Sequence, residues 1–491
     1  MKIIKLSLFI ALTLASVQCS SDFLETAPPD TINTANYPQT AEDLITLVNG
    51  AYQPLQRPKL YNMRMWTTDI IAGNSNVGAG GGDDGIETIQ LSNFTTGTDN
   101  AGVLDLWRGP WPGILSANIV LKEGEKLDIN ESIKNRSLGE AHFLRSYYYF
   151  LLVRFFGGVP IITTPQSVND DLYPARASKE EVYELIISDL EKAISLLPEK
   201  QSYSSSDVGR ASKGAAIGML AKVYLTLENW PKVVELTQQL EGMGYALNTN
   251  YGDNFNLKTE NSNESLFEVQ YHTNGGYDFW SNEFQSAWGS AFMGPRGSGM
   301  VSGAYGWNQP TEEFMNQYEN GDLRKDVTVL YEGCPTFDGK TYNPTYSFTG
   351  YNVRKFLVGL SDVSTYDNNP LNFPILRYAD VLLMKAEAHA MLGQVSQALV
   401  PLNMVRERAG LSKITNATAT NIREIILHER RMELAFEGDR WFDLLRVDKG
   451  QYGLNFLHSI GKTNASTKHL LFPVPQIEID RNPKLNQNPG Y

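Results

Sequence analysis

Three pairs of neighbouring carboxylates are the residues of this chain best suited to acid–base chemistry: Asp83-Asp84, Asp170-Asp171 and Glu312-Glu313. Two carboxyl groups that flank a glycosidic bond can hydrolyse it, one as the acid and the other as the base or nucleophile. Acidic pairs are also common on solvated surfaces, and we expect no catalytic residue among these. Because Asp83 and Asp84 lie in a glycine run, a structural Ca²⁺ or sugar hydroxyl groups are alternative ligands for them.

The sequence lacks the common catalytic motifs. Gly461-Lys462-Thr463 and Gly339-Lys340-Thr341 have no upstream glycine at the spacing of a phosphate-binding loop. His428-Glu429 begins a zinc-protease motif, but Met432 stands where the second histidine is needed. The net charge of −13 disfavours binding to nucleic acid. We therefore expect a protein that is not an enzyme and has no cofactor beyond the structural Ca²⁺ considered above.

The first 18 residues have the layout of a secretory signal peptide. Lys2 and Lys5 precede an apolar run from residue 6 to residue 17, which is too short to span a bilayer. Cys19 follows directly, and this position predicts that it is lipidated after cleavage. An ordinary signal peptide cleaved nearby is the alternative, since Gln18 departs from the usual residue before a lipidated cysteine. Residues 19–38 read as an extended tether, and folded structure is expected from about Thr40.

The elements that position these residues are mainly helices. Apolar residues recur at three- and four-residue steps from Ala141 to Phe155, and Gly157 ends that helix. A second helix is expected over 178–197, with a capping box at its start. Two helical hairpins, over 211–240 and 378–408, carry small residues at matching spacings and resemble tetratricopeptide pairs. Generic antiparallel helix pairs fit the same spacing.

Two long segments, about 67–102 and 271–372, read as irregular loops. Segments of this length inside a compact domain are usually functional or disordered. Their many aromatic residues argue against disorder. The expected fold is therefore mostly α: a single α-rich domain over 39–491, built on a frame of tetratricopeptide-like helix pairs with large irregular loops and a few short strands.

Residues 429–446 alternate charged and apolar side chains. On a helix Glu429 and Glu433 lie one turn apart with Arg430 beside them, so intrahelical ion pairs in a structural network are expected.

Four stretches together resemble the SusD/RagB family of Bacteroidetes surface lipoproteins. They are residues 19–25 (CSSDFLE), 140–160 (EAHFLRSYYY running on to FGGVP), 377–388 (RYADVLLMKAEA) and 429–446 (ERRMELAFEGDRWFDLLR). The second and fourth stretches are the most specific, and all four occur in the family's order.

The resemblance implies a non-enzymatic protein that is held at the cell surface of the outer membrane by a lipid on Cys19. It also implies capture of a glycan and its delivery to a partner, a SusC-like TonB-dependent outer-membrane transporter. Family ligand sites lie in the loops after the first helices and in the middle of the chain. By position and chemistry, the expected ligand-binding residues are Asn76, Asp83, Asp84, Trp280, Trp288, Arg296, Tyr305 and Trp307.

The sequence leaves three other interpretations of the function open. The same frame can bind a peptide or host protein, as in RagB-like receptors, through backbone edges or an apolar groove. A secreted glycoside hydrolase would need a cleft with paired carboxylates. A scaffold without a ligand of its own is the third alternative.

Overall fold

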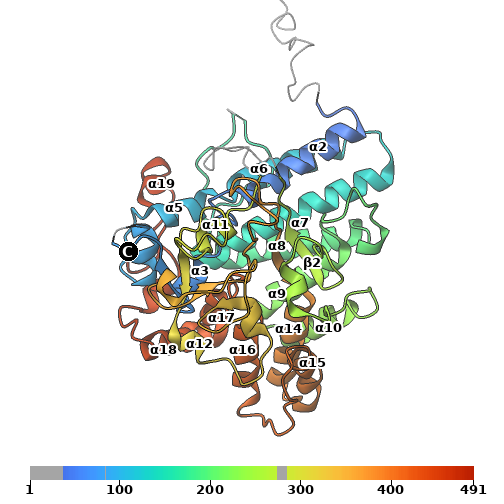
Figure 1. Cartoon of the computed structure of the whole chain (residues 1–491). Coiled ribbons are helices and arrows are strands. Elements are labelled where there is room, and N and C mark those ends of the chain that lie inside the picture. The colour runs from blue at the N-terminus through green and yellow to red at the C-terminus, as the bar shows by residue number, and fades with distance from the viewer. Residues whose placement is uncertain (1–36, 83, 168, 274–284) are drawn as a thin grey trace, which may run out of the picture.

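The computed structural model describes residues 37–82, 84–167, 169–273 and 285–491. Helices dominate it, with few short strands, as the sequence predicted (Figure 1). The α-helices are α2 (Ala41–Tyr52), α3 (Thr68–Ile71), α4 (Ile86–Ser92), α5 (Ala101–Arg108), α6 (Trp111–Gly124), α7 (Glu131–Phe156), α8 (Lys179–Leu196), α9 (Lys213–Thr226), α10 (Trp230–Gln239), α11 (Gly289–Met293), α12 (Glu312–Met315), α13 (Arg324–Thr328), α14 (Tyr378–Met391), α15 (Val395–Arg408), α16 (Ile422–Glu433), α17 (Arg440–Arg446), α18 (Gln451–Ser459) and α19 (Gln476–Arg481).

Short 3₁₀ helices and strands complete the described elements. The 3₁₀ helices are η2 (Gln53–Gln56), η3 (Lys200–Ser202), η4 (Tyr251–Phe255), η5 (Pro344–Tyr346), η6 (Val447–Gly450) and η7 (Thr467–Leu470). The strands are β1 (Ser75–Gly78), β2 (Ser265–Val269), β3 (Trp307–Pro310), β4 (Val329–Leu330), β5 (Asn352–Val353) and β6 (Phe373–Arg377). They form antiparallel pairs β1–β3, β2–β6 and β4–β5.

The helix boundaries follow local sequence signals. Thr40 caps α2 and Ser178 caps α8, each through a capping box with the acidic residue three positions later. Gly157, with φ of 73°, ends α7. Both expected hairpins are present, as α9–α10 and α14–α15, and the small residues Ala386 and Ala398 are fully buried there.

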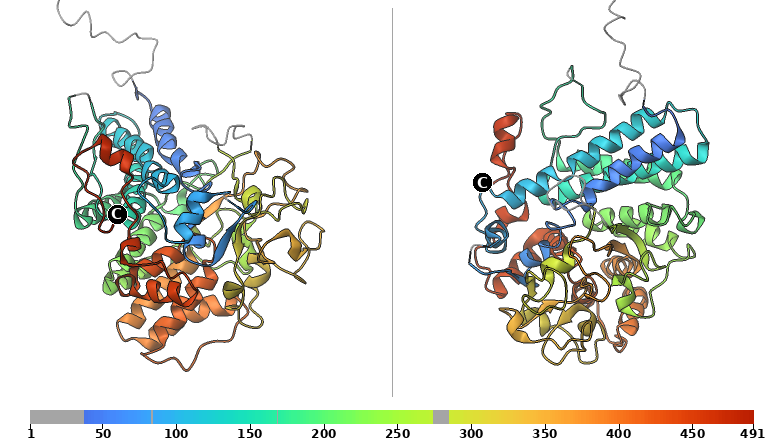
Figure 2. Two further views of the ribbon diagram at one scale, coloured as in Figure 1. Left: turned by 90° about the vertical axis from the view of Figure 1, so that its left-hand side faces the viewer. Right: turned by 45° about the horizontal axis from the view of Figure 1, so that its top comes forward.

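Helices α7, α8, α9, α10, α14 and α15 pack in succession, each against the next. The segments between about 285 and 370, yellow to gold in Figure 2, gather on the side of the molecule opposite this frame. The segments 67–102 and 271–372 were expected to be irregular loops. The first contains α3, β1 and α4, and the second contains α11, β3, α12, α13, β4 and β5. The prediction missed them because these elements are only two to seven residues long, too short to show periodicity.

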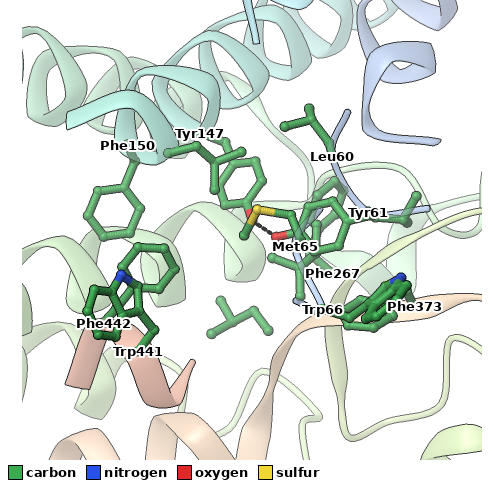
Figure 3. Packing of buried hydrophobic residues seen from close by; sticks show 14 of the residues in the cluster. Leu60, Tyr61, Met65, Trp66, Tyr147, Phe150, Phe267, Phe373, Trp441 and Phe442 are labelled. Atoms are coloured by element: carbon green, nitrogen blue, oxygen red, sulfur yellow. Dashed lines mark hydrogen bonds between the residues drawn. The ribbon is translucent and has the colours of Figure 1, made fainter. Parts of the chain in front are cut away.

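The core is centred on α7, which is buried on all sides from Ser137 to Val153. Tyr147 donates or accepts a hydrogen bond with the hydroxyl of Tyr61, and Phe150 lies one turn further along (Figure 3). The Tyr61 ring packs on Phe373 of β6 at a centroid distance of 5.2 Å. The core thereby joins the N-terminal segment, α7 and the β2–β6 pair.

A buried ion network joins the frame to the C-terminal helices. Arg377 at the end of β6 binds Glu264, Glu433 and Glu437 at 2.6–2.9 Å. Arg430 of α16 binds Asp380 of α14 at 2.7 Å. The network is structural, as predicted. An intrahelical pair forms between Asp443 and Arg446 of α17 at 2.8 Å, but the pairs expected for Glu429, Glu433 and Arg430 within their own helix are absent among the described residues.

Glu429 and Glu433 pair instead with arginines from other elements, which are Arg324, Arg377, Arg406 and Arg408. Their carboxylates point into the core, where a partner is needed to offset the loss of water.

Candidate functional site

The β1–β3 pair brings two of the expected loop segments together. Asn76 lies opposite Gln309, and Gly78 lies opposite Trp307. The amide of Ala79 donates to Gly306 O at 2.7 Å, which extends the pairing into the glycine-rich segment that begins at Ala79. Asn76 is exposed on this pair.

Arg296 and Asp84 converge above Gly80. Asp84 Oδ2 accepts a hydrogen bond from the Gly80 amide at 3.0 Å. A β-carbon on Gly80 would lie 3.2 Å from the Arg296 guanidinium and 3.1 Å from Asp84 Oδ2. Arg296 also donates to Tyr305 O at 3.3 Å. An exposed cation and an exposed anion thus border one glycine backbone, where both can bond to hydroxyl groups.

Aromatic rings continue this surface away from Arg296. Tyr305 lies 6.0 Å from Phe292 and 6.5 Å from Tyr366, measured between ring centroids. Tyr366 in turn meets Trp288 at 4.9 Å. Partial burial raises the pKa of Tyr305 above its ordinary value, and the Tyr366 phenol adds to the rise. The Tyr305 hydroxyl is therefore protonated at neutral pH and able to donate.

Trp307 does not offer the stacking face that the sequence predicted. Only 9% of it is exposed, and its ring packs against Trp66 and Phe292. A β-carbon on Gly85 would lie 2.2 Å from the ring, so the turn covers it closely. The indole therefore contributes buried apolar surface. It packs against Phe292, which in turn contacts Tyr305.

Two aromatic residues that the sequence reasoning passed over are exposed at this surface. Phe348 is 73% exposed, and its ring lies over Gly81. Its backbone amide donates to the buried Gln309 Oε1 at 2.9 Å, which fixes the residue on β3. Tyr366 is 38% exposed. The signal available in the sequence was an aromatic residue flanked by Ser, Thr or Asp within an aperiodic segment.

We call this surface the loop face, and it consists of Asn76, Asp84, Arg296, Tyr305, Phe348 and Tyr366. Of the expected ligand residues, Trp288 adjoins it and is half-buried. Asp83 and Trp280 lie outside the described residues. The loop face therefore offers flat apolar rings beside groups that donate and accept hydrogen bonds.

The described carboxylate pairs are engaged in local structure. Asp170 accepts from the Ser167 amide at 2.6 Å, and Asp171 pairs with Lys484 at 2.7 Å. Glu313 pairs with Arg431 at 2.6 Å in the first turn of α12. These bonds hold loops and helix ends in place.

Within the described ranges, no group of three or more His, Cys, Asp or Glu side chains is placed to hold a metal ion. Because Asp83 lies outside those ranges, the structural Ca²⁺ stays a prediction. No helix in the described part of the chain is long and apolar enough to cross a membrane.

Comparison with known proteins identifies the family. A model described as "SusD family" matches residues 242–491, and a second, "Starch-binding associating with outer membrane", matches residues 22–225. The chain belongs to the SusD family. The SusD-like protein P2 of Formosa agariphila is 29% identical over 98% of this chain and 99% of its own length.

Solved structures of this family share the fold. A laminarin-binding SusD-like protein has a TM-score of 0.80 and 28% identity, covering 92% of this chain and 100% of that protein. Surface glycan-binding protein A from Bacteroides fluxus has a TM-score of 0.80 and 26% identity, with the same coverage. The resemblance drawn from the four sequence stretches is thus confirmed. These SusD relatives are named as binding proteins, and the family is associated with the outer membrane.

Proposed function

We propose that this SusD-family protein captures a glycan on the loop face and delivers it to a SusC-like TonB-dependent outer-membrane transporter. The observation that carries the proposal is the exposure of two aromatic rings along this surface. Phe348 lies over Gly81, next to the glycine bordered by Arg296 and Asp84, and Tyr366 contacts Tyr305. A pyranose ring stacks its apolar face on an aromatic ring, and its hydroxyl groups bond to carboxylate and guanidinium groups. Structural relatives named for laminarin and glycan binding support the same ligand class.

In this proposal the protein binds its ligand without hydrolysing it. The described carboxylate pairs support this because each has a member held by a structural hydrogen bond or ion pair. A hydrolase needs two carboxyl groups facing one bond across a cleft.

Calorimetry on the chain from residue 20 onward tests the glycan site. The probes are laminarihexaose and maltohexaose, each with the wild type and with the double variant Phe348→Ala, Tyr366→Ala. We expect at least one hexaose to bind, and the double variant to bind it at least tenfold more weakly. Loss of two stacked rings at about 1 kcal/mol each accounts for that factor. The matched control is Tyr173→Ala, which removes an exposed tyrosine elsewhere.

Two results would contradict the proposal. Equal affinity in the double variant would place the ligand elsewhere, and shorter oligosaccharides appearing in the sample would show an enzyme. If neither hexaose nor any glycan on an array binds, the peptide-receptor alternative becomes the better hypothesis.

The lipid anchor and the partner are further parts of the proposal. Cys19 carries the lipid that holds the protein on the outer face of the outer membrane, and the helical frame contacts the transporter. Val400 and Met404 support this contact, because they are exposed one turn apart on α15. In the native cell, Cys19→Ala should release the protein from the membrane fraction. The double variant Val400→Arg, Met404→Arg should reduce co-purification of the transporter, and unchanged recovery would rule out this face.

A further inference from the structure

A pocket lies between the end of α2 and β2, and none of the loop-face residues lines it. Its volume is about 270 Å³, just below the range typical of sites for drug-sized ligands. Asn49 and Tyr52 of α2 and Gln56 of η2 form one wall. The turn with Val208 and the residue after β2, Gln270, form the other.

The Gln270 wall is rigid. Its amide nitrogen donates to Asn261 Oδ1 at 3.1 Å and to Glu268 O at 3.2 Å. Its amide oxygen accepts from Asn261 and Asn372, both at 2.9 Å. Gly209, with φ of 95°, lies directly against this amide, because a β-carbon there would be 2.5 Å from Gln270. The Gln270 side chain and the backbone at Gly209 are therefore fixed before any ligand binds, which reduces the conformational entropy lost on binding.

Tyr52 provides a fixed aromatic surface. Its hydroxyl accepts a hydrogen bond from the Ala211 amide at 2.9 Å, and its ring packs on Phe267 at a centroid distance of 6.3 Å. The half-buried ring is thus held at both ends while it lines the pocket.

The charges around the pocket are balanced. Arg210 pairs with Glu140 and Asp207, each at 3.0 Å, and donates to Asn49 Oδ1 at 2.9 Å. Burial raises the pKa of Glu268, and that carboxyl accepts hydrogen bonds from Asn261 and Asn372. Because Arg210 is paired and the Glu268 carboxyl is buried and hydrogen-bonded to neutral groups, the pocket favours a neutral ligand over an ion.

Two carboxamide groups remain available to such a ligand. Gln56 donates its Nε2 to Gln270 O at 2.6 Å, which leaves Oε1 as an acceptor. Asn49 accepts from Arg210 through Oδ1, which leaves Nδ2 as a donor. Among the described residues, neither of these two free atoms has a hydrogen-bond partner.

We propose that this pocket binds one neutral sugar unit, as a second carbohydrate site independent of the loop face. The aromatic surface of Tyr52 packs on the apolar face of the sugar ring. Asn49 Nδ2 and Gln56 Oε1 bond to its hydroxyl groups, each of which can both donate and accept. A neutral ring with several hydroxyl groups matches the size, the neutrality and the paired donor and acceptor of the pocket.

The test uses the chain from residue 20 onward with Phe348→Ala and Tyr366→Ala, so that the loop face is already disabled. D-Glucose, D-galactose, D-mannose and N-acetyl-D-glucosamine are each added at millimolar concentration, and saturation-transfer NMR detects binding. We expect a signal from at least one sugar. Val208→Trp, which fills the pocket from a side chain that is 49% exposed, should reduce this signal at least fivefold.

The matched control is Leu172→Trp, since Leu172 is 51% exposed outside the pocket. It should leave the signal unchanged. Gln56→Leu, which removes the acceptor without filling the pocket, should also weaken the signal. Because it also breaks the bond from Nε2 to Gln270 O, we expect the melting temperature to fall by a few degrees. No signal from any of the four sugars, or a signal that survives Val208→Trp, would overturn the proposal. Failure here is separate from failure of the loop face, which is measured with the hexaoses on the wild type.

Discussion

The rings of Trp288 and Tyr366 meet edge to face, with centroids 4.9 Å apart and planes at 79°. Trp288 precedes α11, and its amide donates to Asn62 Oδ1 at 2.6 Å, so it is anchored to the N-terminal part of the chain. Tyr366 comes from the loop before β6. An edge-to-face contact of this kind holds one ring in place while its other face stays open.

Tyr366→Phe and Tyr366→Ala should therefore differ in glycan binding. Phenylalanine keeps both the contact with Trp288 and the stacking face, so we expect affinity for the bound hexaose within threefold of the wild type. Alanine removes the ring, and we expect a loss of about 1 kcal/mol, or roughly fivefold. Calorimetry on the two single variants measures both values. An equal loss of affinity in Tyr366→Phe and Tyr366→Ala would show that the site recognises the hydroxyl and not the ring.

Gly85→Ala should weaken both the fold and the binding. Gly85 has φ of 77°, where an alanine costs about 1–2 kcal/mol, and its new methyl group would meet the Trp307 ring at 2.2 Å. Displacing Trp307 would disturb the surface that it supports, so hexaose affinity should fall as well.

Gly82→Ala is the matched control for that variant. Gly82 has φ of 63°, but a β-carbon there meets nothing within 4 Å among the residues that the structure describes. In urea unfolding, Gly82→Ala should lower the free energy of unfolding only by the cost of the backbone conformation. Its affinity for the hexaose should change little. Equal behaviour of the two variants would mean that the contact between Gly85 and Trp307 is unimportant.

Arg377→Met should destabilise the protein by about 3–5 kcal/mol. The substitution leaves Glu264, Glu433 and Glu437 with fewer partners in a buried setting, and uncompensated buried charge is expensive. Lys232→Met breaks an exposed pair with Glu235 and should leave the urea midpoint unchanged. A small effect for Arg377→Met would indicate that water reaches the carboxylates.

The helical frame could be predicted from sequence because its signals are local. The Thr40 and Ser178 caps, the glycine after α7 and the two hairpins each depend on residues within a few turns of one another. The existence of a structural ion network was predicted, but its pairing was not, because the partners of Glu433 come from other elements, such as Arg377 on β6. Local spacing rules cover only neighbours on the same helix.

The loop face was predictable only in part, for the same reason. Composition pointed to segments that the structure brings together, since Asp84, Arg296 and Tyr305 lie near one another and Asn76 lies on the adjoining β1–β3 pair. Which aromatic ring faces outward depends on contacts between distant segments. Trp307 is covered by Gly85, whereas Phe348 is held outward by Gln309. Neither outcome follows from the residue type.

Glu260 should make the stability of the protein decrease between about pH 4.5 and pH 7. Burial raises the pKa of Glu260 to about 7, and the Glu268 carboxyl adds to the rise, while a hydrogen bond from the Asn372 amide at 2.8 Å opposes it. In this window the folded state binds more protons than the unfolded state, so the free energy of unfolding falls as pH rises.

The variant Glu260→Gln tests this, because it keeps the acceptor for the Asn372 amide but cannot ionise. Urea unfolding at pH 4 should therefore give similar values for the two proteins. At pH 8 the variant should be more stable by about 1–2 kcal/mol, after allowance for solvent screening of this half-buried group. A constant difference across this range would show that Glu260 ionises as freely in the folded protein as in the unfolded chain.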